Sequence, residues 1–176
     1  TSFSMAMDGR WVPMKRTALA LHALIRSRFR GDALQLIAFG RQAQVMDIEE
    51  LTALDAMYEK GTNLHHGLLL ANRHFRKHPN AQPVLLIVTD GEPTSHLEAS
   101  GHTYFDYPPS PVTIAYAVRE LDNARRLGAQ VYLQSTRRAV PAVPTTARFV
   151  EGHSHATDHL VQPTSRLHLR ADRLLV

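Results

Sequence analysis

Apolar residues recur along the chain with two different periods, and these periods predict alternating helices and strands. Apolar stripes at spacings of three and four residues predict helices over residues 11–29, 64–78 and 111–127. Short apolar runs bounded by glycine or proline predict strands over residues 32–40, 84–89 and 129–134, with a shorter strand at 43–46 and a brief acidic helix at 47–57. This alternation favours an α/β fold: a doubly wound, mostly parallel central sheet with helices on both faces.

The helix stripes also predict which side chains enter the core. The first helix has the stripe Trp11, Met14, Ala18, Leu21 and Ile25. The helix over 111–127 has the stripe Ile114, Val118, Leu121 and Leu127. We expect both stripes to face the sheet, because an amphipathic helix buries its apolar side.

One predicted strand runs directly into a stretch that can carry chemistry. Val84–Val88 is an uninterrupted apolar run, which is the pattern of a central strand covered on both faces, and Thr89-Asp90-Gly91 follows at once. Open α/β sheets place their ligand sites at the carboxyl ends of strands, so Asp90 is a candidate binding residue. The alternative is that Asp90 only caps the turn that follows it.

Composition and charge narrow the classes of function. The 176-residue chain has no apolar run near the ~18 residues that cross a bilayer, and it has no cysteine for disulfides or thiolate metal sites. Together these features favour a cytoplasmic protein. Most of the net charge of +4 lies in the last part of the chain, so nucleic acid is not an expected partner. We divide the chain into an α/β domain over residues 1–134 and a basic, irregular tail, containing Pro, Arg and His, over 135–176.

Three oxygen-bearing stretches stand at or just beyond predicted strand ends. They contain Ser2 and Ser4, then Gly61-Thr62, and finally Asp90. Loops at one edge of a doubly wound sheet can converge, and hydroxyl and carboxylate oxygens suit a hard cation such as Mg²⁺.

These three stretches resemble the von Willebrand factor A (VWA) domain with its metal-ion-dependent adhesion site. Thr1–Ser4 is similar to the last four positions of the Asp-x-Ser-x-Ser signature, Thr62 to the distant threonine, and Thr89-Asp90-Gly91 to the third element. The resemblance implies that Ser2, Ser4, Thr62 and Asp90 hold Mg²⁺, with Mn²⁺ as the alternative. It also implies a non-catalytic module whose metal receives a Glu or Asp from a protein partner.

The sequence is most similar to the bacterial cytosolic branch of the family. The Arg30-Gly31-Asp32 strand start and Thr89-Asp90-Gly91-Glu92-Pro93 resemble the VWA modules that accompany MoxR-type or chelatase-type AAA+ ATPases. This similarity implies an adaptor role for such an ATPase.

The sequence also departs from the family pattern at both ends. The first aspartate of the signature and the central strand before it would precede Thr1, and the tail does not resemble the usual last helix and strand. We therefore expect a truncated chain whose sheet lacks its first central strand. Without that carboxylate, the affinity for the metal should fall.

Several alternatives remain open at this point. Asp90 could be the nucleophile of a hydrolase or phosphotransferase. Such a site would also need a second carboxylate and a lysine near the strand ends, and the chain has three lysines, Lys15, Lys60 and Lys77, and no glycine-rich G-x-x-x-x-G-K phosphate loop. His65 and His66 are adjacent on a helix and cannot share one ion, so we expect a solvated or helix-start role for them. Tyr104, Phe105 and Tyr107 form either a partner-binding rim or a packed loop.

Overall fold

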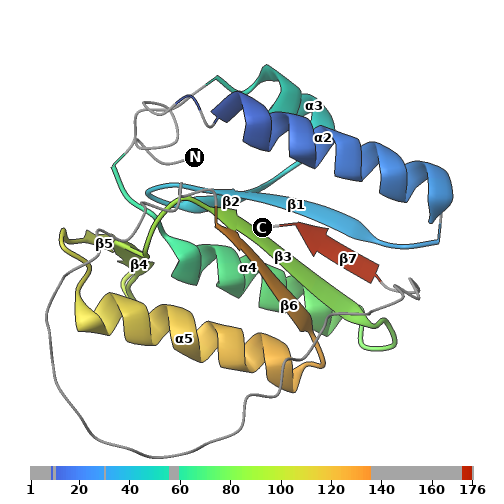
Figure 1. Cartoon of the computed structure of the whole chain (residues 1–176). Coiled ribbons are helices and arrows are strands. Elements are labelled where there is room, and N and C mark those ends of the chain that lie inside the picture. The colour runs from blue at the N-terminus through green and yellow to red at the C-terminus, as the bar shows by residue number, and fades with distance from the viewer. Residues whose placement is uncertain (1–8, 10, 30, 56–59, 136–171, 176) are drawn as a thin grey trace, which may run out of the picture. The chain divides into compact units, whose positions relative to one another are not determined.

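The computed structural model describes residues 9, 11–29, 31–55, 60–135 and 172–175, which form one α/β arrangement (Figure 1). The helices are α2 (Trp11–Arg28), α3 (Ile48–Ala53), α4 (Leu64–Lys77) and α5 (Pro111–Arg126). The strands are β1 (Leu34–Phe39), β2 (Ala43–Met46), β3 (Pro83–Thr89), β4 (Ser95–Leu97), β5 (Thr103–Phe105), β6 (Gln130–Ser135) and β7 (Asp172–Leu175). The predicted helices and strands between residues 11 and 135 are confirmed, with small shifts of their ends.

The main sheet has five strands in the order β2-β1-β7-β3-β6. Strand β1 is parallel to β7, and β7 is parallel to β3, which is parallel to β6; only β2 runs antiparallel, against β1. The carboxyl ends of β1 and β3 therefore lie at the same edge of the sheet. This is the edge at which the sequence predicts a ligand site.

The position between β1 and β3, which we expected to be empty, is occupied by β7. Its backbone pairs Leu174 with Gln35 on one side and with Leu85 on the other. We expected these four residues to belong to an irregular tail, and they form a strand instead. Residues 136–171 lie outside the described part of the chain, so the domain boundary at residue 135 stays a prediction.

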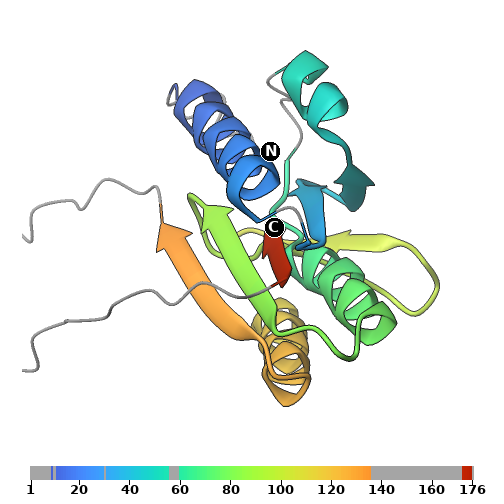
Figure 2. The same ribbon diagram turned by 90° about the vertical axis from the view of Figure 1, so that its right-hand side faces the viewer.

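Helices cover both faces of the sheet, as Figures 1 and 2 show. On one face, α4 and α5 pack on β1 and β3 around the fully buried Leu68, Leu85 and Ile87. On the other face, α2 and α3 pack around Ala18 and Leu36. Residues of β3 alternate between buried and half-buried, so the strand is covered more completely on the α4–α5 face. The fold class predicted from the sequence is thus confirmed.

The stripe predicted for α2 is the buried one, whereas the stripe predicted for α5 is wrong. Of the α2 positions, Trp11, Ala18 and Ile25 are buried. In α5, the buried residues are Thr113, Ala117, Glu120 and Ala124. The predicted Ile114, Val118 and Leu127 are instead exposed, and only Leu121 packs against the core. Small residues let α5 approach α4 closely, and hydrophobicity alone does not reveal this preference.

The connection between β3 and α5 contains more structure than the sequence indicated. Strands β4 and β5 form an antiparallel hairpin that pairs Ser95 with Phe105 and Leu97 with Thr103. We call residues 95–105 the β4–β5 hairpin. It lies near the start of α4 and at the sheet edge where β3 ends (Figure 1).

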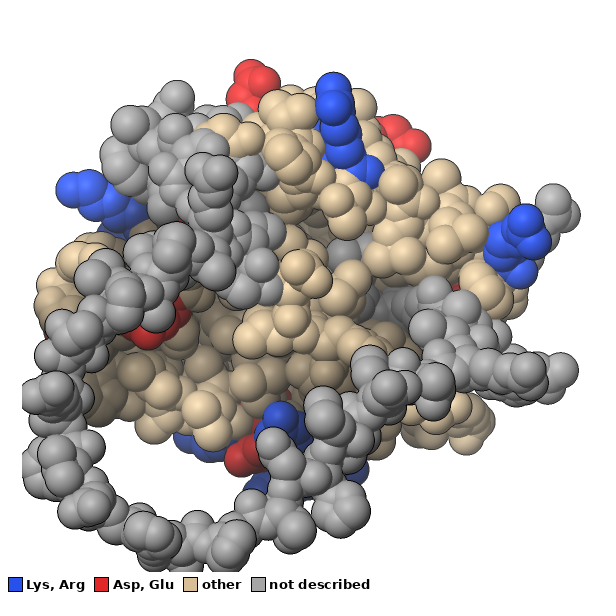
Figure 3. Space-filling model, in the orientation of Figure 1, with Lys and Arg blue, Asp and Glu red and all other residues tan. Residues whose placement is uncertain are grey.

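Two surface properties bear on partners. Among the described residues, no helix is long and apolar enough to cross a membrane. On the face shown in Figure 3, Lys and Arg side chains stand at separate places rather than in one patch.

Candidate functional site

Asp90 directly follows the last residue of β3 and is 4% exposed, so its carboxylate is buried at the sheet edge. Burying a carboxylate is costly unless cations or hydrogen-bond donors compensate for the lost water. Asp90 therefore stays a candidate binding residue at the carboxyl end of a central parallel strand.

Thr62 precedes α4 in a loop that is tied to the end of β1. The N–H of Asn63 donates to the carbonyl of Gly40 at 2.8 Å, and its side-chain amide donates to the carbonyl of Arg41 at 3.0 Å. The Asn63 side-chain oxygen also accepts from the N–H of His66 at 2.9 Å, which caps the helix. Asn63 is fully buried, so one side chain fixes both the loop and the start of α4.

Three hydrogen bonds connect the Thr62 loop to the segment that follows Asp90. The N–H of Thr62 donates to the hydroxyl of Thr94 at 2.9 Å, and its carbonyl accepts from the N–H groups of Thr94 and Ser95 at 3.2 and 3.3 Å. These bonds use only the backbone of Thr62, so they leave its hydroxyl to other partners. The loop before α4 and the segment after β3 are thereby held together at one edge of the sheet.

Gly61 allows this close approach. Its φ of +128° belongs to a region that side chains rarely adopt, and a Cβ there would lie 2.5 Å from the Ser95 hydroxyl and 3.3 Å from the Arg41 Cα. A glycine directly before Thr62 is thus a steric requirement of the site. The sequence predicts a loop at Gly61, but this contact depends on residues that are distant along the chain.

Of the four predicted metal ligands, the structure describes Thr62 and Asp90, while Ser2 and Ser4 lie outside the described residues. Thr62 is 8% exposed, so both described candidates are buried oxygen donors on loops joined by hydrogen bonds. A neutral hydroxyl together with a carboxylate is a donor set that fits Mg²⁺. Among the described residues, no group of three His, Cys, Asp or Glu side chains offers an alternative metal site.

His65 and His66, adjacent residues in the first turn of α4, connect this helix to strands β4 and β2. Nδ1 of His65 accepts from the N–H of Leu97 in β4 at 3.1 Å, and Nδ1 of His66 accepts from the N–H of Ala43 in β2 at 3.1 Å. His65 is 3% exposed, which corrects the expectation that it is solvated. The expectation of a helix-start role is confirmed, since both residues lie in the first turn of α4 and their rings bind two different strands, β4 and β2.

Burial keeps these histidines neutral. It lowers the pKa of His65 from 6.5 to about 4, although the nearby Glu120 carboxylate opposes the shift. The pKa of His66 is lowered by burial and then by the charge of Arg73. A neutral ring is needed here because a protonated Nδ1 cannot accept a hydrogen bond.

A second buried histidine, His96 of β4, connects the hairpin to α5. Its Nδ1 lies 2.8 Å from the Thr113 hydroxyl, and its ring stacks on Tyr116 with a centroid distance of 4.6 Å. On its other side lies Tyr104, with a centroid distance of 4.9 Å. Burial lowers the pKa of His96.

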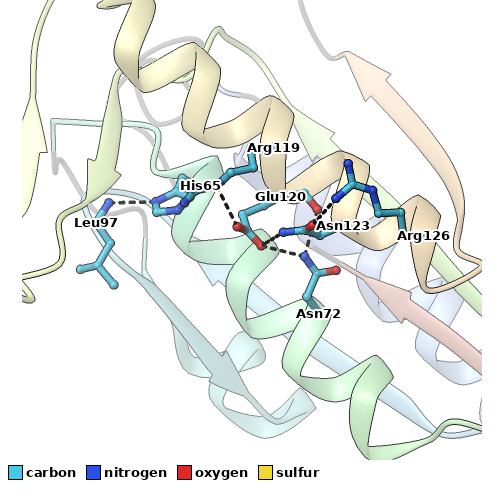
Figure 4. Close-up of polar contacts among 7 residues, drawn as sticks. All are labelled: His65, Asn72, Leu97, Arg119, Glu120, Asn123 and Arg126. Carbon is cyan, nitrogen blue, oxygen red and sulfur yellow. Dashed lines mark hydrogen bonds and ion pairs between the residues drawn. The ribbon is translucent and has the colours of Figure 1, made fainter.

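Polar groups also join α4 to α5 beneath the site, as Figure 4 shows. The Asn72 amide donates to the carbonyl and the carboxylate of Glu120 at 2.9 and 3.0 Å, and the Asn123 amide donates to the same carboxylate at 3.2 Å. Arg119 Nε lies 3.5 Å from the other carboxylate oxygen. Because Asn72 and Glu120 are both buried, this cluster fixes how the two helices pack.

Sequence reasoning missed the residues that support the site. Thr94 and Ser95 belong to a stretch of sequence without a periodic apolar pattern. The roles of His65 and His96 depend on neighbours that are distant in sequence. Asn63 alone had a recognisable signal, because an asparagine before an apolar stripe favours a helix cap.

Comparisons with known proteins agree with this geometry. Residues 1–167 match the family model described as "Rv0959-like protein, vWA domain". The chain is 57% identical over 155 residues to the protein Rv0959 of Mycobacterium tuberculosis and to the protein Mb0984 of Mycobacterium bovis. The match covers 86% of this chain but 22% of each relative, so the chain spans about a fifth of their length. Strands β1 to β6, the Thr62 loop and Asp90 lie within the matched residues, and the chain belongs to the family of Rv0959-like proteins, in their VWA domain.

Proposed function

We propose that this VWA domain is a metal-dependent protein-interaction module. Thr62 and Asp90, together with Ser2 and Ser4, would hold Mg²⁺ or Mn²⁺. The ion would supply an open coordination position for a Glu or Asp carboxylate of a partner. The observation that carries the proposal is the pair of buried oxygen donors, Thr62 and Asp90, on two loops joined by hydrogen bonds at one sheet edge.

The chain's own residues prepare this site before any ion binds. The backbone of Thr62 is fixed by Thr94 and Ser95, while Asn63 fixes the loop against the end of β1. A site held in place by its supporting residues loses little conformational freedom on binding. Asp90 would supply the negative charge, and Thr62 a neutral oxygen.

In the longer relatives, such a module would work beside other parts of the protein. We propose an adaptor role toward a MoxR-type AAA+ ATPase, which would contribute the carboxylate. The alternative, an enzyme that uses Asp90 as a nucleophile, has no further observation in its favour.

The test is the change in melting temperature of the chain on titration with MgCl₂. A ligand that binds only the folded state stabilises it by about 2.7 kcal/mol at a hundredfold excess over Kd. We expect a Mg²⁺-dependent rise that is lost in Asp90→Asn and in Thr62→Ala. The control is Asp122→Asn, which lies on the exposed side of α5 and should retain the rise.

Two results would contradict the proposal. One is a folded chain whose melting temperature does not respond to millimolar Mg²⁺ or Mn²⁺. The other is an unchanged metal response in Asp90→Asn, because a site without its carboxylate should bind far more weakly.

A further inference from the structure

Three aromatic side chains of the β4–β5 hairpin and the residues after it are exposed close to the Thr62 loop. Tyr104, Phe105 and Tyr107 are 38%, 42% and 78% exposed. Single exposed apolar residues are common, whereas here three exposed aromatic residues stand within four positions of the chain. Aromatic residues are also enriched at the centres of protein interfaces.

The hairpin is held firmly. The N–H of Leu97 donates to Nδ1 of His65, the N–H of Ser95 donates to the Thr62 carbonyl, and the N–H of Asp106 donates to the Thr94 carbonyl at 3.0 Å. The Tyr104 ring packs on the buried His96. A surface that is already ordered loses little entropy when a partner binds, and such surfaces make good binding platforms.

The aromatic surface directly adjoins the candidate ion site. The ring of Phe105 lies 3.6 Å from the point where a Cβ of Gly61 would stand, and Gly61 precedes Thr62. A protein segment that places a carboxylate near Thr62 would therefore bring its neighbouring side chains onto Phe105.

The charge of this surface narrows the chemistry of the partner. Residues 91–110 contain Glu92, Glu98 and Asp106, all exposed, and no Lys or Arg. A strongly acidic segment would be repelled by these carboxylates. A segment with one carboxylate for the ion, an apolar side chain for the rings and a basic residue for Glu98 or Asp106 would complement the surface.

We propose that the β4–β5 hairpin and Tyr107 form the docking surface for a protein segment that has one Asp or Glu beside an apolar residue and a Lys or Arg. This inference rests on the proposed metal-dependent binding and specifies the partner of that same site. The ion would hold the carboxylate, the aromatic rings would bind the apolar side chain, and the hairpin carboxylates would select against acidic runs.

The test uses a phage-displayed library of random peptides, selected on the full chain in MgCl₂ and eluted with EDTA. We expect the eluted peptides to contain a single acidic residue beside an apolar and a basic one. A synthetic peptide of the enriched sequence is then titrated against the chain and its variants by fluorescence anisotropy.

The variants separate the docking surface from the ion site. Tyr107→Ser should weaken binding about tenfold, which is typical of an aromatic interface residue. Glu98→Lys should weaken it as well. The control Tyr132→Ser removes a tyrosine that is 52% exposed on β6, outside the hairpin, and should bind normally.

The outcomes distinguish the proposed docking surface from the proposed metal-dependent function. Peptides that bind in Mg²⁺ but are unaffected by Tyr107→Ser and Glu98→Lys would overturn the docking surface and leave the proposed function standing. Enrichment of polyacidic peptides would also overturn it. If no peptide binds in a Mg²⁺-dependent way, both the docking surface and the proposed function are wrong.

Discussion

Replacing His65 should flatten the dependence of folding stability on pH, because this buried histidine resists protonation. Its pKa is about 4 in the folded chain, against the ordinary value of 6.5 that applies when the chain is unfolded. Between these two values the unfolded chain binds more protons than the folded one. The stability due to the neutral ring is therefore complete above about pH 7 and is lost as the pH falls toward 4.

The size of the effect follows from the shift in pKa. At pH 5 the unfolded ring is almost fully protonated and the folded ring is mostly neutral, so His65 alone should lower the free energy of unfolding by about 2 kcal/mol relative to pH 7. Most unperturbed carboxylates remain ionised at pH 5 and contribute little to this difference. His66 and His96 have lowered pKa values too and act in the same direction.

The measurement is urea denaturation at pH 7 and pH 5, followed by the fluorescence of Trp11, which is the only tryptophan of the chain. In His65→Asn, the side-chain oxygen can still accept from the N–H of Leu97, but nothing titrates. The variant should lose about 2 kcal/mol less than the original chain between the two pH values. The exposed His102→Asn is the matched control and should leave the pH dependence unchanged.

The absolute stability of His65→Asn is a separate quantity, since the ring also contacts Tyr116 with a centroid distance of 4.9 Å. Only the difference between pH 7 and pH 5 tests the reasoning. If that difference is the same in His65→Asn and in the original chain, the ring is not held neutral by folding, and its role as an acceptor for Leu97 is refuted.

Three further predictions concern stability at pH 7 and can be checked by urea denaturation. Gly61→Ala should destabilise the chain more than Gly128→Ala, because both have positive φ but only the Cβ at Gly61 meets other atoms; equal losses would contradict this steric reasoning. Glu120→Ala should cost about 1.5–3 kcal/mol, because it removes the buried carboxylate that accepts from the Asn72 amide while the bond to the backbone carbonyl of residue 120 remains; a double-mutant cycle with Asn72→Ala should show coupling, and additive losses would contradict this. Asp47→Ala should cost about 1 kcal/mol, since Asp47 forms a reciprocal capping box at the start of α3; no loss would mean that this short helix does not depend on its cap.

The elements of the fold could be predicted where one period dominates. The α2 stripe from Trp11 to Ile25 and the apolar run Val84–Val88 have patterns that few other structures share. The α5 stripe failed because its buried face consists of small and polar residues, among them Ala117 and Glu120, whose burial depends on contacts with α4.

The site could be predicted in part because its chemistry is local. Asp90 follows a strand directly, and Thr62 precedes a helix, so both positions can be read from short stretches. The hairpin could not be predicted, since strands of three residues have too few positions to show alternation. Strand β7 was missed because it is also short and because two of its four residues are charged.

The placement of β7 has a consequence for the order of folding. Strands β1 and β2 form one half of the main sheet and β3 and β6 the other, and β7 provides the backbone pairing between the halves. It follows β6 by an intervening stretch, residues 136–171, so the continuous sheet depends on a segment that is distant in sequence from both halves. Pairing over such sequence separations is slow to form. The hydrogen bonds between the Thr62 loop and the segment after Asp90 do not involve β7, so these two loops can come together before the sheet becomes continuous.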